Sequence, residues 1–398
     1  MDFFKIITSR SYICTLFLII LMLTSFSSCG NFHKEPETDD SLGKPISLPT
    51  PPAINPEYVK QVANVCNNWY NEFLKKSAFF GGMIVAKNGN ILFEKYNGIA
   101  HVGYNDSINA NTPLHIASVS KTFTAMAVLK LWQDKKLNID DEFSKYFPAF
   151  NYPGVTIRSL LTHRSGLPNY VYFMDEIGWS AKKFVTNQDV LNTLISKKNV
   201  LRNINPPNKH FAYCNTNYAL LALLIEKITS MPYPEYIKKS IFEPLKMNNS
   251  FVYSDKDSAR TTPSYDYRNY QAVFINLDKV YGDKNIFSTP QDLLKWDRLL
   301  SSELYLSKAT LAEAYKPYSN EKSGVRNYGL GWRMYNFPHK KIIYHNGWWH
   351  GSNAVFIRLI EEDATIIVIG NKYNRNIYKA KELIGMFTGP ISTENDDE

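Results

Sequence analysis

The chain has 398 residues, of which 44% are hydrophobic and 14% aromatic, a balance typical of a globular protein with a sizeable core. This composition excludes a collagen, a coiled coil and a wholly disordered chain. The net charge of +8 is modest for this length, and lysine and arginine are scattered rather than gathered in a stripe, which argues against nucleic-acid binding.

The first 28 residues are typical of an export signal. Lys5 and Arg10 provide positive charge, and the apolar run 13–23 is too short to span a bilayer. Small residues then precede Cys29 in an arrangement that resembles a bacterial lipoprotein box, whose cysteine is lipidated and becomes the mature N-terminus. The alternative is an ordinary cleaved signal with an incidental cysteine. We expect residues 1–28 to be a signal peptide and the protein to be a lipoprotein of the bacterial cell envelope, at the outer membrane, the periplasmic face or the cell surface.

Residues 29–56 are polar and rich in proline, which predicts an extended tether between a lipid anchor and the folded domain. The acidic run within it is interpreted as a solvated linker, with a cue for export to the cell surface as the alternative. Cys66 and Cys214 lie far apart, and the chain has no cysteine or histidine spacing of the kind that binds zinc. We therefore expect no metal, no cofactor and, by default, no disulfide. Residues 388–398 are interpreted as an acidic tail.

The helical spacing of apolar residues predicts a helix over residues 56–76. Two apolar runs follow, 82–86 and 91–96, and Asn88-Gly89 between them is a strong sign of a β-hairpin. Near the C-terminus the sequence predicts three more strands and then a helix, at residues 342–344, 354–360, 365–369 and 377–386.

Strands at both ends of the chain and a long helical middle predict an α/β (α+β) fold. One antiparallel β-sheet would be built from both chain ends and flanked by helices. We expect one domain over residues 57–387, with a sheet lobe (57–114 and 336–387) and a large, mostly helical lobe (115–335). A ligand site is expected in the cleft between the two lobes.

The stretch Ser118-Val119-Ser120-Lys121 has a serine three residues before a lysine, and it opens an apolar helical run that continues to Trp132. Residues three apart lie on one face of a helix, so Lys121 would meet Ser118 and could take its hydroxyl proton. For this stretch alone, a serine N-cap followed by an exposed lysine is the plainer alternative. Two further elements follow downstream in order, Tyr213-Cys214-Asn215 and His345-Asn346-Gly347.

Together the three motifs resemble the serine β-lactamase and penicillin-binding-protein superfamily, in the class C-like branch that also contains D,D-peptidases and esterases. Other stretches that are similar to this branch are Leu160–Pro168, Phe242–Met247 and Tyr328–Trp332. The resemblance covers about residues 57–387, and it implies the β-lactamase/D,D-peptidase fold.

The resemblance also implies a role for each motif. Ser118 is the nucleophile, at a helix start whose dipole favours developing negative charge, and Lys121 is its base. Tyr213 carries protons to the leaving group and from water, with a core tyrosine as the alternative. Asn215 holds Lys121 and the substrate amide. In an extended segment its side chain would point in the same direction as that of Tyr213, two residues before it.

The third motif is expected to line a sheet edge, to which an extended substrate can add as a strand. The main-chain N–H groups of Ser118 and Trp348 would form the oxyanion hole, with Asn346 and Gly347 beside them. True β-lactamases usually have Lys-Thr-Gly where this chain has a motif that begins with His345. A histidine near its ordinary pKa of ~6.5 carries less charge at pH 7 than a lysine, so we expect carboxylate-bearing substrates to bind better as the pH falls. The alternative is a structural histidine at a strand end.

Several aromatic residues next to these motifs either wall the pocket or pack in the core: Tyr170, Tyr172, Phe173, Trp348, Trp349 and His350. No glutamate stands where class A enzymes need a deacylation base, and the chain has no Gly-x-Ser-x-Gly elbow, which disfavours an α/β-hydrolase.

The sequence thus predicts an exported, lipid-anchored serine hydrolase that forms an acyl-enzyme on Ser118 and cleaves amide or ester bonds, as a D,D-peptidase or an esterase does. Its partners would be a small-molecule, peptide or ester substrate, with cell-wall peptide among the candidates, and a membrane through the lipid anchor, but no nucleic acid. The alternatives are a class C-like β-lactamase and, from another class, a non-catalytic penicillin-binding sensor or surface scaffold.

Overall fold

The computed structural model describes residues 42–104 and 106–390. The expected signal peptide, the lipidated Cys29, the first part of the tether and most of the acidic tail lie outside the described residues, so they stay predictions. No helix in the described ranges is long and apolar enough to cross a membrane.

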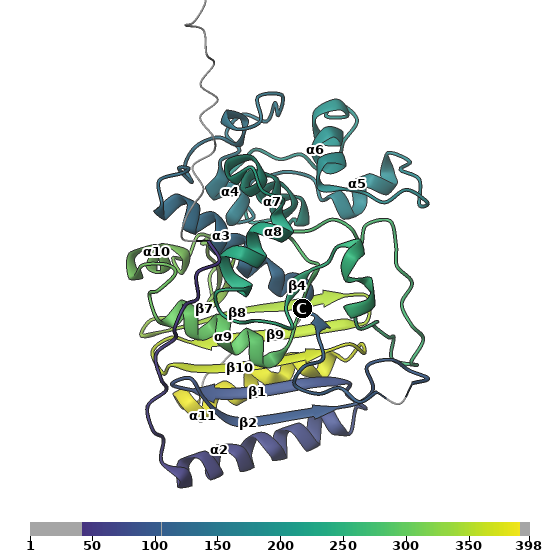
Figure 1. Cartoon of the computed structure of the whole chain (residues 1–398). Helices are drawn as coiled ribbons and strands as arrows, with labels where there is room; N and C mark the ends of the chain where they lie inside the picture. Colours follow the sequence, from purple (N-terminus) through teal and green to yellow (C-terminus); the bar gives the residue numbers. More distant parts are fainter. Residues whose placement is uncertain (1–41, 105, 391–398) are drawn as a thin grey trace, which may run out of the picture. The chain divides into compact units, whose positions relative to one another are not determined.

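A seven-stranded antiparallel sheet, in the order β2-β1-β10-β9-β8-β7-β6, joins the two ends of the described chain (Figure 1). β1 pairs with β10, so that Gly81 lies opposite Gly370. The prediction of one antiparallel sheet built from both chain ends is confirmed. The strands are β1 (Gly81–Lys87), β2 (Asn90–Asn97), β6 (Arg326–Tyr328), β7 (Arg333–Phe337), β8 (Lys340–Trp349), β9 (Ser352–Leu359) and β10 (Ala364–Gly370).

The β1–β2 hairpin turns where the sequence predicts it. Asn88 (φ 49°) and Gly89 (φ 75°) both adopt left-handed backbone, as a two-residue type I′ turn requires. Asparagine and glycine tolerate this conformation better than other residues, so the two residue types account for the turn.

β8 is much longer than the predicted run 342–344 and includes the whole third motif. The added residues lack an apolar pattern, but they pair with β9 in continuous register, with Gly347 opposite Ala354. On its other side, the pairing of β8 with β7 ends at Tyr344. In the described part of the chain, residues 345–349 therefore form an open sheet edge, as expected for this motif.

Alternate residues of β1 face two different cores, because successive side chains of a strand point to opposite faces. Val85 packs with α2 (Pro56–Trp69) and η6 (Arg375–Ile384) on one face of the sheet. Ile84 belongs to the core on the other face, which includes residues of α9 (Pro290–Ser301). Helices therefore flank both faces of the sheet, as predicted.

The two predicted terminal helices are present, but their winding differs from a plain α-helix. The predicted helix 56–76 is α2 followed by a π-helical turn, η1 (Tyr70–Lys75). The predicted helix 377–386 is mostly the 3-10 helix η6, followed by the short α11 (Gly385–Thr388).

The middle of the chain is helix and loop around two neighbouring buried helices, α3 (Ser120–Gln133) and α7 (Asn215–Thr229). A second sheet, β3-β5-β4, was not predicted, because strands of two or three residues are too short to show a pattern. The remaining elements are β3 (Leu114–His115), η2 (Ala117–Val119), η3 (Phe143–Lys145), α4 (Ile157–Leu161), α5 (Tyr170–Glu176), α6 (Asn187–Ser196), α8 (Tyr233–Ile237), η4 (Lys238–Phe242), β4 (Phe251–Val252), η5 (Asp255–Arg260), β5 (Ile286–Ser288) and α10 (Lys308–Ala314).

The described end of the predicted tether, residues 42–55, packs against the domain, and we call it the strap. Leu42, Ile46 and Leu48 are partly buried against the main core. Hydrogen bonds to the domain run from Gly43 N–H to the Lys239 carbonyl (2.9 Å), from Ile46 N–H to the Pro244 carbonyl (2.9 Å), from Arg298 to the Pro49 carbonyl and from Asn90 to the Pro52 carbonyl (2.7 Å). The segment is extended, as predicted, but this part of it is not a free linker, because its apolar side chains and main-chain groups have partners on the domain.

Candidate active site

Ser118 and Lys121 meet at the start of α3. Ser118 lies in η2, directly before α3, and is half-buried, whereas Lys121 is fully buried. Nζ of Lys121 lies 3.0 Å from Oγ of Ser118. The preceding Ala117 has a φ of 47°, a left-handed backbone that is uncommon for alanine and turns the chain sharply out of β3. The structure thus brings the predicted serine and lysine into hydrogen-bonding contact.

Two further acceptors hold Nζ of Lys121. It donates to Oδ1 of Asn215 (2.8 Å) and to the main-chain carbonyl of Asp283 (2.8 Å). The contact with Asn215 was predicted, but the reason given, an extended segment, is wrong. Asn215 is the first residue of α7, and Cys214 is the N-cap of that helix. The carbonyl of Asp283 was not predicted, since a main-chain carbonyl leaves no signal in a sequence.

Tyr213 lies beside the same lysine. Nζ of Lys121 is 5.0 Å from the centroid of the Tyr213 ring, and the guanidinium carbon of Arg333 is 5.1 Å from it. The ring of His163 packs 4.3 Å away, centroid to centroid. Tyr213 is therefore part of the site that contains Ser118 and Lys121, and Arg333 brings a permanent positive charge to it.

His163 holds the chain that carries Tyr213. Its Nδ1 accepts the main-chain N–H of Cys214 (3.1 Å), and its carbonyl accepts the N–H of Ala212 (2.9 Å). Burial, followed by the charge of Lys121, lowers the pKa of His163 well below its usual value, so the ring stays neutral and Nδ1 keeps its lone pair. In the sequence, His163 stands within the family-like stretch Leu160–Pro168, and no role was predicted for it.

His345 is enclosed, with no exposed surface. Its Nδ1 donates to the carbonyl of Asn346 (2.7 Å), and the hydroxyl of Tyr328 donates to Nε2 (3.2 Å). Burial, followed by the charges of Arg333 and Lys121, holds the pKa of His345 well below 6.5. The expectation that His345 gains charge as the pH falls and binds a substrate carboxylate is therefore wrong, and the structural alternative is favoured.

Gly347 allows β8 to approach the turn that carries the serine. A Cβ atom at this position would lie 2.4 Å from the carbonyl oxygen of Ile116 and 3.2 Å from the main-chain nitrogen of Ser118. Only glycine permits this approach. The main-chain N–H of Ser118 thus lies close to β8, as an oxyanion hole shared with the N–H of Trp348 would need.

The side chains of Asn346 and Trp348 point away from this side of β8. Asn346 lines a small cavity with Tyr344 and Tyr378 on the face that η6 covers. The indole of Trp348 is 63% exposed and packs near Tyr373, at 6.1 Å between ring centroids. The side chain of Asn346 therefore does not face Ser118, because strand alternation directs it to the opposite face, and the place of Asn346 beside the oxyanion hole stays a prediction for its main chain. For Trp348, only the main-chain N–H remains a predicted contact.

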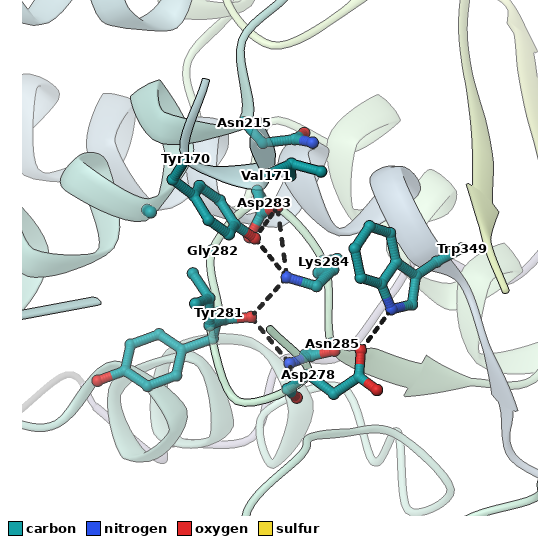
Figure 2. Close-up of polar contacts among 12 residues, drawn as sticks. Tyr170, Val171, Asn215, Asp278, Tyr281, Gly282, Asp283, Lys284, Asn285 and Trp349 are labelled. Carbon is teal, nitrogen blue, oxygen red and sulfur yellow. Dashed lines mark hydrogen bonds and ion pairs between the residues drawn. The ribbon is translucent and has the colours of Figure 1, made fainter. Parts of the chain in front are cut away.

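Trp349 lies on the same face of β8 as His345 and Gly347. Its side chain contacts a loop that was not predicted to belong to the site. Its Nε1 donates to Oδ1 of Asp278 (2.7 Å), and Nζ of Lys284 lies 4.7 Å from its ring centroid. Figure 2 shows this indole beside both residues. The loop of residues 278–285 therefore connects the end of β8 with Asp283, whose carbonyl holds the site lysine.

Proteins of known family resemble this chain over most of its length. The sequence model of the family Beta-lactamase matches residues 67–383. The chain belongs to the beta-lactamase family. It is 33% identical to penicillin-binding protein 4* of Bacillus subtilis (strain 168), over 78% of this chain and 73% of that protein. It is also 26% identical to protein flp of Staphylococcus aureus (strain MRSA252), over 75% of this chain and 61% of that protein.

Two solved structures share the fold of this beta-lactamase-family chain. The octameric penicillin-binding protein homologue from Pyrococcus abyssi has a TM-score of 0.68 at 24% identity, over 83% of this chain and 77% of that chain. The D-amino acid amidase from Ochrobactrum anthropi SV3 has a TM-score of 0.66 at 20% identity, over 83% of this chain and 98% of that chain. These likenesses confirm the predicted β-lactamase/penicillin-binding-protein fold.

As a member of the beta-lactamase family, the protein is a serine hydrolase of the β-lactamase/D,D-carboxypeptidase/esterase type. Within residues 42–104 and 106–390, no group of three or more His, Cys, Asp or Glu side chains is placed to hold a metal ion. Cys66 and Cys214 are buried and not joined to each other, and burial raises the pKa of Cys214 to about 11, which keeps it a thiol.

Proposed function

We propose that the protein forms an acyl-enzyme on Ser118 and cleaves amide or ester bonds, as D,D-peptidases and esterases do. The observation that carries this proposal is the 3.0 Å contact between Nζ of Lys121 and Oγ of Ser118. When its amine is free, Lys121 can accept the hydroxyl proton while the oxygen attacks the substrate carbonyl. Asn215 and Asp283 hold the lysine at that distance.

Tyr213 and the edge of β8 would complete the reaction. Tyr213, whose ring contacts Lys121, is assigned the transfer of the proton to the leaving group and later from water. The N–H groups of Ser118 and Trp348 are assigned to the oxyanion hole, which stabilises the negative oxygen of the tetrahedral intermediate.

We further propose that the substrates are peptides or amides that contain D-amino acids, such as cell-wall peptides, or small esters. Relatives and fold neighbours named penicillin-binding protein 4* and D-amino acid amidase support this class. A neutral histidine stands where true β-lactamases usually have lysine, which weighs against the runner-up, a class C-like β-lactamase. The family match itself keeps that runner-up open to test.

Export and a lipid anchor on Cys29 are also part of the proposal, and the charge, length and small residues of the N-terminal sequence support them. The protein would then work at the bacterial cell envelope. Two attached acyl chains would be enough for stable anchoring.

The deciding experiment compares the wild type with Ser118→Ala on p-nitrophenyl esters, D-Ala-D-Ala peptides and a chromogenic cephalosporin. The wild type should hydrolyse the esters or the peptides faster than the cephalosporin, and Ser118→Ala should lose both turnover and covalent labelling by a fluorophosphonate. A cephalosporin that is the best substrate would favour the runner-up. Covalent labelling of the wild type without turnover of any substrate would favour a non-catalytic sensor. An adduct on Ser118→Ala at the wild-type rate would show that Ser118 is not the nucleophile.

A further inference from the structure

The carbonyl of Asp283 belongs to a loop, yet it lies within 2.8 Å of Nζ of Lys121. Residues 278–285 contain no helix and no strand, so regular secondary structure does not fix this carbonyl. The lysine nitrogen has three N–H directions. Asn215 and Asp283 take two of them, and together they leave the third directed at Ser118. The aim of the lysine therefore depends on what holds the loop.

The side chain of Asp283 is held by a buried network (Figure 2). The hydroxyl of Tyr170 donates to Oδ2 of Asp283 (2.9 Å), and Nζ of Lys284 donates to the same hydroxyl. Nζ of Lys284 also lies 3.7 Å from Oδ2. Tyr170, Asp283 and Lys284 are 0%, 1% and 2% exposed. Polar contacts that are shielded from water are stronger and more directional than exposed ones, so this network can hold the loop in one conformation.

The same loop is attached to two other elements of the site. The carbonyl of Gly282 accepts the hydroxyl of Thr124, which lies in α3 (2.6 Å). Lys284 lies under the ring of Trp349, at the end of β8. Tyr170 is the first residue of α5. The network therefore lies where α3, the helix that contains Lys121, meets the sheet edge and α5.

We propose that Tyr170, Asp283 and Lys284 form a positioning network that fixes the carbonyl of Asp283 and thereby aims Lys121 at Ser118. The inference rests on the proposed roles of Lys121 and Ser118 as base and nucleophile. The three residues are positioning residues, since they act on the reaction through the lysine.

The test removes a single hydroxyl with Tyr170→Phe. The matched control is Tyr315→Phe, because Tyr315 also has a buried hydroxyl bound to a buried cation, Arg358, which in turn pairs with the buried Asp297. The hydrogen bonds of that second group run to α9 and β9 instead of to the site. Both variants lose a similar buried contact, so both should lower the melting temperature to a similar, small extent.

Only Tyr170→Phe should slow the chemistry. We expect the maximal rate constant for labelling of Ser118 by a fluorophosphonate, and kcat for a p-nitrophenyl ester, to fall about 10- to 100-fold with KM nearly unchanged. In a Lys121→Ala background the same substitution should have no further effect, because residues that act through one another are not additive. Asp283→Asn, which keeps the carbonyl but removes the charge, should show the same pattern and serves if Tyr170→Phe does not fold.

Labelling of Tyr170→Phe at the wild-type rate would overturn the network, and so would a loss that simply multiplies in the Lys121→Ala background. An equal loss in Tyr315→Phe would also overturn it, because the effect would then be one of general stability. These outcomes differ from failure of the proposed function, in which the wild type itself is not labelled and the network loses its purpose.

Discussion

Lys121 and Tyr213 touch through the amine and the ring, and we propose that they transfer the same protons. Lys121→Ala and Tyr213→Phe should therefore each lower kcat by roughly 10²- to 10⁴-fold while KM changes little. The double variant should be hardly worse than the worse single variant, because residues that act as one unit are not additive. Steady-state kinetics on one ester substrate measures all four enzymes. Losses that multiply would show that the two side chains serve separate steps.

The buried His345 and the permanent charge of Arg333 make a second prediction at the scale of single residues. Since His345 stays neutral, KM for a carboxylate substrate and for its methyl ester should run in parallel between pH 5.5 and 8. Arg333→Gln should raise KM for the acid roughly fivefold, which corresponds to about 1 kcal/mol for a partly exposed charge, and should leave the ester unchanged.

Arg260→Gln is the matched control for this charge, because Arg260 is exposed and pairs with Asp257 away from the motifs. It should change neither KM. A gain in affinity for the acid alone as the pH falls would show that a titrating group binds the carboxylate. Equal effects of Arg333→Gln on both substrates would show that the charge of Arg333 does not bind the carboxylate.

At the scale of elements, the close approach of β8 to η2 depends on one missing side chain. In Gly347→Ala, the new Cβ would collide with the carbonyl of Ile116, so β8 must move away from Ser118. We expect a loss of stability of about 1–3 kcal/mol and a clear drop in the labelling rate of Ser118. Gly385→Ala is the control, because a Cβ there meets no atom within 4 Å and the backbone is helical. Normal labelling of Gly347→Ala would show that the strand need not be so close.

Several elements could be predicted because their signals are local. Asn88-Gly89 predicts the β1–β2 turn, and long apolar runs predict β9 and β10. β6 and the last half of β8 show no alternation of apolar and polar residues, so periodicity could not predict them as strands, and their partner strands decide the pairing. Only the resemblance placed the third motif at a sheet edge. The serine, lysine and tyrosine of the site could be predicted because they stand in local sequence motifs. The carbonyl of Asp283 could not, because its role comes from tertiary contacts alone.

At the scale of the whole molecule, three buried histidines make stability depend on pH. Burial lowers the pKa of His115 to about 4 and that of His163 and His345 well below 6.5. As the pH falls below about 6.5, the unfolded chain takes up protons that the folded protein does not. The free energy of unfolding should therefore fall with pH, by at most about 1.4 kcal/mol per pH unit for each histidine. At about pH 7.5 and above, roughly one unit above the unfolded pKa, all three are neutral in both states, and the effect ends.

Urea unfolding at pH 7.5, 6 and 5 measures this dependence. His115→Gln should flatten the curve between pH 6 and 5, whereas His339→Gln, at an exposed position, should leave it unchanged. Equal slopes for the wild type and His115→Gln would mean that His115 takes up its proton in the folded state as well.

The strap also contributes at this scale. A protein that begins at residue 42 should melt a few degrees higher than one that begins at residue 55, because the longer one keeps the apolar contacts of Leu42, Ile46 and Leu48. Both keep Asn55, the N-cap of α2, and both should have the same kcat. Equal melting temperatures by calorimetry would show that the strap packs without stabilising the domain.

If Cys29 carries the proposed lipid, the docked strap limits how far the enzyme can work from the membrane. At full extension a stretch as long as residues 29–56 can span at most about 90 Å, whereas one as long as residues 29–41 can span at most about 40 Å. With a lipid on Cys29, the domain would stay within the shorter of these two distances from the bilayer. It would then act only on bonds within that distance of the bilayer. The length of the twelve residues 30–41, more than the chemistry of the site, would decide which possible substrates the enzyme meets.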